Sequence, residues 1–257
     1  GGTEKAMSGY GVLSAFYDRL MADNAYEQRA DYLLQLMAKH GRPHPEMLLD
    51  LACGSGNLTI PLAQRGVEMI GVDGSADMLA EAQAKPTTAQ TPVLYLQQDM
   101  RELDLYGTVS GAVCAMDGLN HLCRTADLAV VMQRLGLFIE PDGLLIFDAN
   151  TPYKHRQVLG DNAFVFEEED FLCVWRNHLL SRTCEVDMQL DFFVDNGDGY
   201  DRYEDHIRER AYSLSTWHRL LQEAGFELLA VYGDMTTEPP GDEEERWVLV
   251  AQNRKGL

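Results

Sequence analysis

LLDLACGSGNLT, at residues 48–59, decides the fold of this chain. The segment has the pattern of an apolar strand that carries an acid, a turn with two glycines, and the beginning of a helix. Gly54 and Gly56 permit a sharp bend and remove the Cβ atoms that would block a ligand. Backbone N–H groups at the start of the following helix attract polar or anionic groups. The segment therefore predicts a ligand-binding loop between a strand and a helix.

The positions of the glycines separate two classes of nucleotide-binding loop. A dinucleotide fingerprint, G-x-G-x-x-G, would have a third glycine where this chain has Thr59. Asp50, just before the loop, would repel a pyrophosphate and would attract a ligand that carries an ammonium group and a positive sulfur. Both residues disfavour a dinucleotide-dependent oxidoreductase, which is kept as an alternative function.

Two further acids stand at the ends of predicted strands. Asp73 closes the apolar segment 67–72, and Asp99 follows the segment 92–97. An acid at the end of the second strand can accept hydrogen bonds from both hydroxyls of a ribose. Because the carboxyl ends of parallel strands meet at one edge of a sheet, we expect both acids to lie with Asp50 along a ligand-binding edge.

Short apolar strands alternate with helical segments from residue 47 onward. We predict strands near 47–52, 67–72, 92–97, 109–116 and 143–148, and helices near 57–65, 75–84 and 125–140. Two further helices are predicted at 10–22 and 25–40. This alternation predicts a parallel sheet that is covered on both faces.

The periodicity changes in the last third of the chain. Polar and apolar residues alternate strictly over 183–192, which is typical of a half-buried antiparallel strand, and a turn signal follows at 195–199. Residues 160–213 are therefore predicted to form an antiparallel insertion of about four strands. A helix at 214–224 and strands at 227–232 and 246–252 would complete the main sheet.

Four motifs resemble those of class I S-adenosylmethionine (SAM)-dependent methyltransferases. They are LDLACGSGN at 49–57, GVDGSADML at 71–79, LQQDMREL at 96–103 and LGLFIEPDGLLIFD at 135–148. The segments AFYDRLM at 15–21 and YSLSTW at 212–217 resemble a narrower bacterial group of small-molecule methyltransferases, some of which act on amino groups of nucleotide-linked sugars. The resemblance implies SAM as the cofactor and methyl transfer as the reaction.

The predicted fold class is therefore α/β, with a Rossmann-like, seven-stranded, mostly parallel sheet and helices on both faces. An N-terminal helical cap and an antiparallel β insertion after strand 5 are expected in addition. The expected domains are the cap at 1–45, the SAM-binding core at 46–159 and 214–257, and the insertion at 160–213. The insertion would cover the ligand edge as a lid and form much of the substrate pocket.

The resemblance also implies which residues hold the cofactor. The backbone of residues 52–56 would face the methionine part of SAM, Asp73 would hold the ribose hydroxyls, and Asp99 with Met100 would meet the adenine. Arg29 could pair with the SAM carboxylate. The expected set is Tyr10, Tyr17, Arg29, Asp50, Ala52, Cys53, Gly54, Gly56, Asn57, Asp73, Gly74, Met78, Asp99, Met100 and Met116.

Two of these expectations concern a helix outside the main sheet. Tyr10 and Tyr17 lie seven residues apart, and therefore on one face of the first predicted helix. Packing in the core would explain this spacing. The resemblance instead implies that the helix folds over the cofactor, with Tyr17 closing on its methionine end.

The loop at 116–122 follows the fourth strand and should lie directly below the transferring methyl group. His121 in this loop could act as a general base, because histidine exchanges protons near neutral pH. A capping or packing role is the alternative for His121. Asp148, at the end of the fifth strand, is the second candidate for orienting an amine or removing its proton. Methyl transfer needs a base only when the nucleophile arrives protonated, which explains why the sequence displays no obvious catalytic group.

Asp117, Asp148 and Asn150 together resemble the oxygen ligands of a divalent metal. A metal-assisted O-methyltransferase is thus an alternative, but a β insertion of this kind is unusual there, and we expect no metal. The preferred function is in-line methyl transfer to a small-molecule amine. Two competing hypotheses are O-methylation and a non-catalytic SAM-binding protein.

Composition limits the class of partner. Lys and Arg number 21 against 41 Asp and Glu, the net charge is −20, and no run of basic residues is present. Nucleic acid is therefore not an expected partner, because binding its phosphates requires basic residues. The five cysteines lack C-x-x-C spacing, and no apolar run approaches the length of a membrane span. These features predict a cytoplasmic location, no membrane partner and a small-molecule methyl acceptor, and leave the oligomeric state open.

Overall fold

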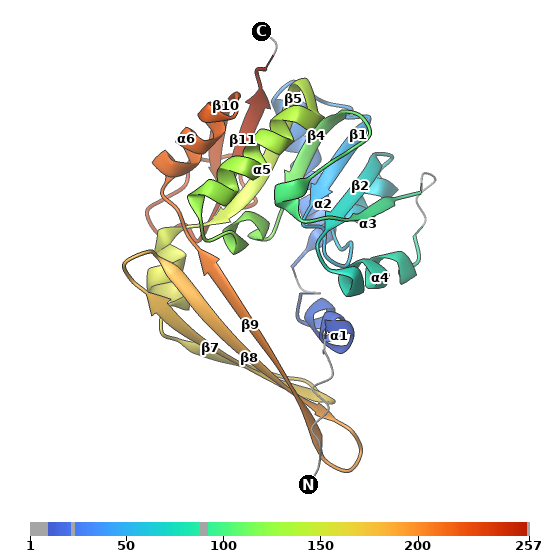
Figure 1. The fold of residues 1–257 in the computed structure, drawn as a ribbon, viewed down its shortest axis with the longest axis vertical. Coiled ribbons are helices and arrows are strands. Elements are labelled where there is room, and N and C mark those ends of the chain that lie inside the picture. The colour runs from blue at the N-terminus through green and yellow to red at the C-terminus, as the bar shows by residue number, and fades with distance from the viewer. Residues whose placement is uncertain (1–9, 22–23, 88–91, 256–257) are drawn as a thin grey trace.

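The computed structural model describes residues 10–21, 24–87 and 92–255, with side chains from residue 13 onward. Its main sheet has seven strands in the order β10-β11-β5-β4-β1-β2-β3 (Figure 1). The strands are β1 (Met47–Leu51), β2 (Glu68–Asp73), β3 (Leu94–Gln97), β4 (Val109–Cys114), β5 (Ile139–Asn150), β10 (Phe226–Gly233) and β11 (Arg246–Asn253). Strands β1 to β5 pair in parallel, and β11 runs antiparallel to both of its neighbours. The predicted seven-stranded, mostly parallel sheet is confirmed.

Helices cover both faces of this sheet. Successive side chains of each strand point to opposite faces, so a strand can pack against helices on both sides. Leu48 of β1 packs with helices α2 (Tyr26–Lys39) and α3 (Thr59–Gln64). Its neighbour Leu49 packs with α5 (Thr125–Phe138) and α6 (Leu214–Glu223) on the other face. Helix α4 (Ala76–Ala84) follows β2. The sheet is therefore enclosed between two apolar layers, and the loops at its carboxyl edge extend from this packed core.

Two elements of the core differ in detail from the sequence-based expectation. Helix α3 begins at Thr59, which places Pro61 in its first turn, where the missing N–H costs nothing. Strand β5 begins at Ile139, four residues earlier than expected, and contains an irregular turn at Asp142 with φ 66°. Gly143 follows in the same turn. A side chain would not fit there, because its Cβ would lie 2.6 Å from the carbonyl oxygen of Ser110.

A second sheet has four antiparallel strands in the order β6-β7-β8-β9. They are β6 (Ala163–Glu167), β7 (Phe171–Leu180), β8 (Glu185–Asp195) and β9 (Tyr200–Arg210). Every second residue of β8 from Val186 to Phe192 is buried, as the alternation predicted. The short helix η3 (Lys154–Leu159), which connects β5 to this sheet, was not anticipated.

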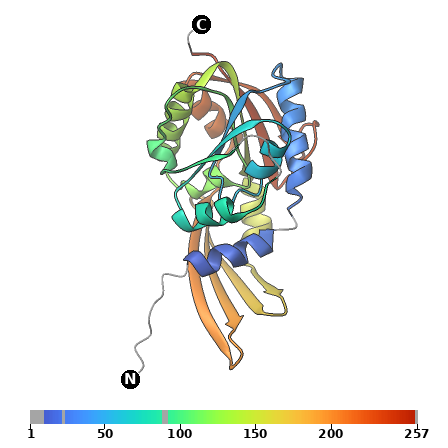
Figure 2. The same cartoon turned by 90° about the vertical axis from the view of Figure 1, so that its right-hand side faces the viewer.

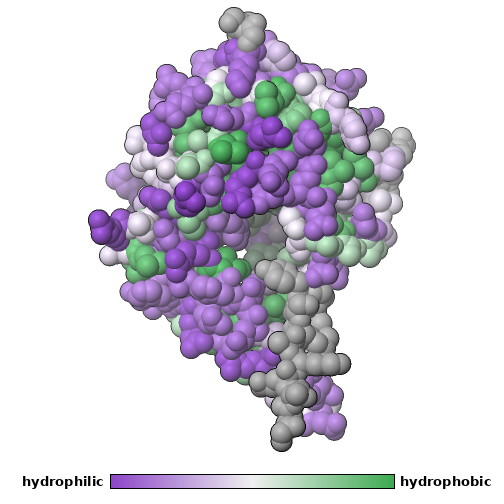
Figure 3. Space-filling model, viewed as in Figure 1, coloured by the Kyte–Doolittle hydropathy of each residue, from purple (hydrophilic) through white to green (hydrophobic). Residues whose placement is uncertain are grey.

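Helix α1 (Tyr10–Met21) lies between the two sheets (Figure 2). Leu13 and Phe16 pack into the apolar face of the four-stranded sheet, and the helix also contacts α4 of the core. On the face drawn in Figure 3, a hollow opens between the core and the four-stranded sheet, with mainly hydrophilic residues above it. None of the helices in the described ranges is long and apolar enough to cross a membrane.

Candidate active site

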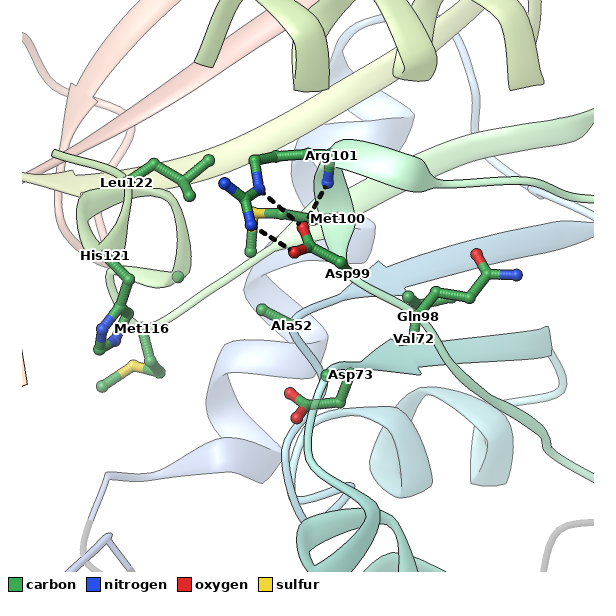
Figure 4. Close-up of a pocket in the computed structure, with 12 residues that line it drawn as sticks. Ala52, Val72, Asp73, Gln98, Asp99, Met100, Arg101, Met116, His121 and Leu122 are labelled. Atoms are coloured by element: carbon green, nitrogen blue, oxygen red, sulfur yellow. Dashed lines mark hydrogen bonds and ion pairs between the residues drawn. The ribbon is translucent and has the colours of Figure 1, made fainter. Parts of the chain in front are cut away.

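A pocket of about 460 Å³ opens at the carboxyl edge of the main sheet (Figure 4). Its walls come from the segments that follow β1, β2, β3 and β4, and include the short helix η1 (Met100–Glu102) and part of η2 (Gly118–His121). In open α/β sheets this edge is the usual place for ligands. The topology thus brings three of the four motifs and the loop at 116–122 to one cavity.

The glycine loop after β1 has the backbone conformation that its composition predicts. Gly54 has φ 56°, and a Cβ on it would meet no atom within 4 Å. Gly56 has φ 79°, and a Cβ there would lie 2.7 Å from the Tyr95 hydroxyl. Gly56 is therefore required by packing against β3, whereas Gly54 leaves open space beside the loop. Ala52 adopts φ 58°, a conformation that is costly for a residue with a side chain and is common at functional sites.

Asp73 is held at the end of β2 by two backbone donors. The N–H of Gly54 donates to Oδ2 at 2.9 Å, and the N–H of Ser75 donates to Oδ1 at 2.9 Å. A carboxylate offers about four acceptor positions, so roughly two remain for a ligand. The side chain is fixed in direction by its own chain and keeps acceptor capacity at the pocket wall (Figure 4).

Asp99 follows β3 and is paired with Arg101, which also lines the pocket. The guanidinium donates from Nη2 to Oδ2 at 2.6 Å and from Nε to Oδ1 at 3.0 Å (Figure 4). These hydrogen bonds lower the pKa of Asp99. Met100 lies beside the pair and adds a sulfur and an apolar surface to the same wall.

Asp50 lies behind the loop rather than in the pocket. Its side chain is buried, and its Oδ2 accepts a hydrogen bond of 2.6 Å from the Thr59 hydroxyl. Burial raises the pKa of Asp50 to about 7. Thr59, which stands where a dinucleotide fingerprint has glycine, is thus the partner of the acid that distinguishes this loop.

The turn after β4 is strained and is held by Asp148 of β5. Met116 and Asp117 both have φ 55°, the left-handed region that residues with side chains rarely adopt. The carboxylate of Asp148 accepts hydrogen bonds of 2.7 Å from the backbone N–H of each residue. Asp148 is buried and does not line the pocket. Its position indicates that it shapes the turn that carries Met116 and His121 to the pocket wall.

A buried cluster of ion pairs lies next to this turn. Arg29 of α2 donates to both oxygens of Asp234, at 2.8 and 3.1 Å. Arg246 of β11 lies 3.4 Å from Asp117 and 3.8 Å from both Asp148 and Asp234. Burial alone would lower the pKa of Arg246, but these carboxylates raise it. Because Arg29 is engaged within the protein, its expected contact with the SAM carboxylate would require an exchange of partners and stays a prediction.

His121 lies on the pocket wall with its ring directed toward the four-stranded sheet. Its Nε2 is 3.2 Å from Oε1 of Glu209, the penultimate residue of β9. Three side chains here could each offer one atom to a metal ion, and these atoms lie within 4.8 Å of one another. They belong to Asp117, His121 and Glu209. Glu209 was not singled out from the sequence, because alternation in β9 does not tell which half of its residues faces the core.

The structure brings together only part of the expected site. Seven of the expected residues line the pocket, namely Ala52, Asp73, Gly74, Asp99, Met100, Met116 and His121. The expected residues that do not line it are Tyr17, Arg29, Asp50, Cys53, Gly54, Gly56, Asn57, Met78 and Asp148. Tyr10 begins α1, but its side chain lies outside the described residues. Residues missed by the prediction are Val72, Gln98, Arg101, Gly118 and Leu122, which adjoin predicted positions in the chain.

Tyr17 points away from the pocket, toward the four-stranded sheet. Its hydroxyl donates to Asp205 of β9 at 2.5 Å, and its ring packs edge-on against Phe192 at 5.4 Å between ring centroids. The neighbouring Asp18 reaches the glycine loop, where it accepts a hydrogen bond of 2.8 Å from Asn57. The helix therefore covers the loop through Asp18. The expected closing of Tyr17 on the cofactor stays a prediction.

Residues 48–143 match the model of a family described as a methyltransferase domain. Over 249 residues the chain is 33% identical to "Putative methyltransferase YqeM" of Bacillus subtilis (strain 168), an alignment that covers 96% of this chain and 98% of that protein. Over 227 residues it is 26% identical to a glycine/sarcosine N-methyltransferase of Parasynechococcus marenigrum, with 85% of this chain and 75% of that protein covered.

Two solved structures have a similar fold. A SAM-dependent methyltransferase from Clostridium acetobutylicum superposes with a TM-score of 0.85 at 27% identity, over 95% of this chain and 98% of the other. The sugar N-methyltransferase KedS8 from Streptoalloteichus superposes with a TM-score of 0.75 at 22% identity, over 95% and 93%. The second likeness concerns the fold alone.

Proposed function

The chain belongs to the family of SAM-dependent methyltransferases, and from this premise we propose that its methyl acceptor is an amine nitrogen of a small molecule. The observation that carries the proposal is the position of His121 on the wall of the pocket, with the acid Glu209 on the other side of its ring. An amine is largely protonated near neutral pH and must lose a proton before it can attack. A histidine at this place can accept that proton.

The residues of the pocket fit SAM. A pocket of about 460 Å³ is in the range of small-molecule sites. Asp73 retains acceptor positions, which suit a pair of ribose hydroxyls. Gly54 leaves open space beside the loop, and Met100 offers an apolar surface to the adenine. We therefore assign the cofactor to this pocket, with Asp73 as its main polar anchor.

SAM supplies a methyl group on a positively charged sulfur, so that the protein's main task is to align the acceptor and to exclude water. The strained turn at Met116 and Asp117 carries His121 to the pocket wall, where we propose that the methyl end of SAM lies, and Asp148 holds that turn. Asp148 is buried and does not line the pocket, which argues against its expected part in removing a proton. We propose instead that Asp148 positions the turn and that His121 takes the proton.

The names of two relatives support an amine. One relative over most of the chain is named a glycine/sarcosine N-methyltransferase. Another, 31% identical over 140 residues, is named a dTDP-3-amino-3,6-dideoxy-alpha-D-glucopyranose N,N-dimethyltransferase of Streptomyces fradiae. Both names describe transfer to nitrogen.

An isotope experiment tests the proposal and does not require that the acceptor be identified first. The protein is incubated with SAM labelled with carbon-13 in the methyl group and with a metabolite extract of Bacillus subtilis, the source of one relative. The labelled product is then examined by carbon NMR, in which N-methyl and O-methyl carbons resonate at different positions. We expect a labelled N-methyl product. A labelled O-methyl product would contradict the proposal, and Asp73→Asn protein serves as the control that should form little of either.

A further inference from the structure

A network of buried polar side chains ends at Glu209. His155 Nδ1 lies 2.9 Å from the carbonyl oxygen of Cys184, and its Nε2 lies 3.3 Å from the Asn150 side-chain nitrogen. The same nitrogen of Asn150 donates to Oε2 of Glu209 at 3.1 Å. Burying several polar groups is costly unless each is paired, and a fully paired network gives a fixed geometry. The network therefore holds one oxygen of Glu209 and fixes the direction of the other.

Asn120 adds a second connection between the core and the end of β9. Its Oδ1 accepts from the backbone N–H of Asn150 at 3.0 Å, and its Nδ2 donates to the carbonyl oxygen of Arg210 at 2.9 Å. Asn120 and Asn150 are completely buried. Glu209 is thus delivered by the four-stranded sheet but held in place by the core, and its Oε1 faces His121 at 3.2 Å.

Charged groups from several elements surround Glu209. Burial and then the charge of Asp117 raise the pKa of Glu209 well above its ordinary value. Burial would also raise the pKa of Asp117, but its hydrogen bond with Glu209 and the charge of Arg246 lower it. The positive charge of Lys154 of η3 favours a lower pKa for both carboxyl groups. Burial and then the charges of Glu185 and Glu209 raise the pKa of Cys123. Lys154 and Arg246 thus balance the negative charge that Asp117 and Glu209 bring beside His121.

We propose that Glu209 is a positioning residue that accepts the Nε2–H of His121 and so leaves Nδ1 of the imidazole unprotonated, ready to take the proton of the acceptor amine. The inference rests on the proposed N-methylation only for its last step. In that step the amine proton passes to Nδ1, and the freed lone pair forms the new N–C bond while the C–S electron pair leaves with sulfur. The negative charge of the neighbouring Asp117 then stabilises the imidazolium.

The side chains of Asp117, His121 and Glu209 could in principle also bind a divalent cation. The surrounding charges favour a proton over a divalent cation between His121 and Glu209, because the positive side chains of Lys154 and Arg246 already interact with Asp117 and Glu209. A divalent ion at this place would be repelled by both side chains. Binding of Mg²⁺ or Mn²⁺ between His121 and Glu209 is therefore a result that would overturn the proposal.

The tautomer of His121 can be measured in the ligand-free protein by nitrogen-15 NMR of labelled histidine, with His121→Gln to assign the signal among the seven histidines. We expect wild-type His121 to carry its proton on Nε2. Glu209→Gln keeps an oxygen for Asn150 and turns an amide N–H toward Nε2, so the proton should move to Nδ1. Glu204→Gln is the matched control, because Glu204 lies on the same strand with a side chain that is 58% exposed. Its spectrum should equal that of the wild type.

The spectra decide the proposal in each case. A wild-type tautomer with the proton on Nδ1, an unchanged tautomer in Glu209→Gln, or a signal that shifts with added Mg²⁺ or Mn²⁺ would overturn it. If Glu209→Gln does not fold, the wild-type spectrum alone is still decisive. None of these results depends on the identity of the acceptor.

Kinetics with an amine acceptor then test the proposed role of Glu209 separately from the proposed N-methylation. We expect Glu209→Gln to lower kcat at least about tenfold with little change in KM, and Glu204→Gln to leave both unchanged. An unchanged kcat would show that Glu209 takes no part in the mechanism, and it would not contradict N-methylation. Transfer to oxygen would refute the proposed acceptor but leave the measured tautomer valid.

Discussion

Asp18 and Lys85 form an ion pair of 2.8 Å that fastens helix α1 to the glycine loop. Lys85 lies directly after α4 and also donates to the carbonyl oxygen of Ser55 at 2.8 Å and to Asn57 Oδ1 at 2.7 Å. Asp18 in turn accepts from the side chains of Ser55 and Asn57. The loop proposed to hold SAM is therefore bound on its outer side to a helix that also packs on the four-stranded sheet.

Lys85→Met should weaken cofactor binding. The substitution removes three polar contacts to the loop and to Asp18, at a cost of about 1 to 2 kcal/mol, so we expect S-adenosylhomocysteine to bind about five to thirty times more weakly. Titration calorimetry measures this change. Lys39→Met, at the exposed end of α2, is the control. An unchanged affinity in Lys85→Met would show that the loop does not need this connection.

Asp50→Asn should stabilise the ligand-free protein at alkaline pH. The folded protein raises the pKa of Asp50 from 3.8 to about 7, so it holds this proton more tightly than the unfolded chain. Stability is therefore lost as pH rises between these two values, by about 1.4 kcal/mol per pH unit. Asparagine does not titrate and retains an oxygen for the Thr59 hydroxyl. The variant should gain stability over the wild type between about pH 5 and about pH 8 in urea denaturation.

Asp77→Asn, an exposed substitution in the first turn of α4, provides the reference for that measurement. Its stability relative to the wild type should be nearly the same at both pH values. Equal behaviour of Asp50→Asn and Asp77→Asn would mean that Asp50 keeps an ordinary pKa in the folded protein.

Arg29→Met should destabilise the protein by about 1.5 to 3 kcal/mol, because it removes both hydrogen bonds to the Asp234 carboxylate and leaves Asp234 and Asp148 with Arg246 at 3.8 Å. The free energy of unfolding in urea measures the loss. Arg19→Met is a matched control, since Arg19 makes an equally short bidentate pair with Asp170, but both side chains are about half exposed. That change should cost less than about 1 kcal/mol. Similar losses in the two variants would contradict the distinction between buried and exposed pairs.

The elements of the fold were predictable because each carries a local signal. Strand β8 alternates polar and apolar residues, and its even-numbered side chains from Val186 to Phe192 are buried as expected. Asp73 and Asp99 follow strands whose ends meet at one edge, and both line the pocket. The spacing of glycine in the loop also placed the turn correctly. Local propensity and periodicity are sufficient at these positions.

Contacts between distant segments were not predictable from such signals. Arg29 and Asp234 are 205 residues apart, and nothing in either neighbourhood indicates that they pair. Alternation in β9 shows that half of its residues face inward, but it does not say which half, so Glu209 was missed. Its meeting with His121 depends on how the four-stranded sheet packs against the core.

The most direct test of the cofactor site is a titration of the protein with S-adenosylhomocysteine after the substitution Asp73→Asn. The amide would turn a donor toward the backbone N–H of Gly54 or Ser75 and would lose the charge that suits two ribose hydroxyls. We expect the affinity to fall at least about tenfold, since hydrogen bonds to a charged group contribute about 1.5 to 3 kcal/mol. Asp77→Asn, four residues further on, should bind as the wild type does. Equal affinity of Asp73→Asn and the wild type would contradict the assignment of SAM to this pocket.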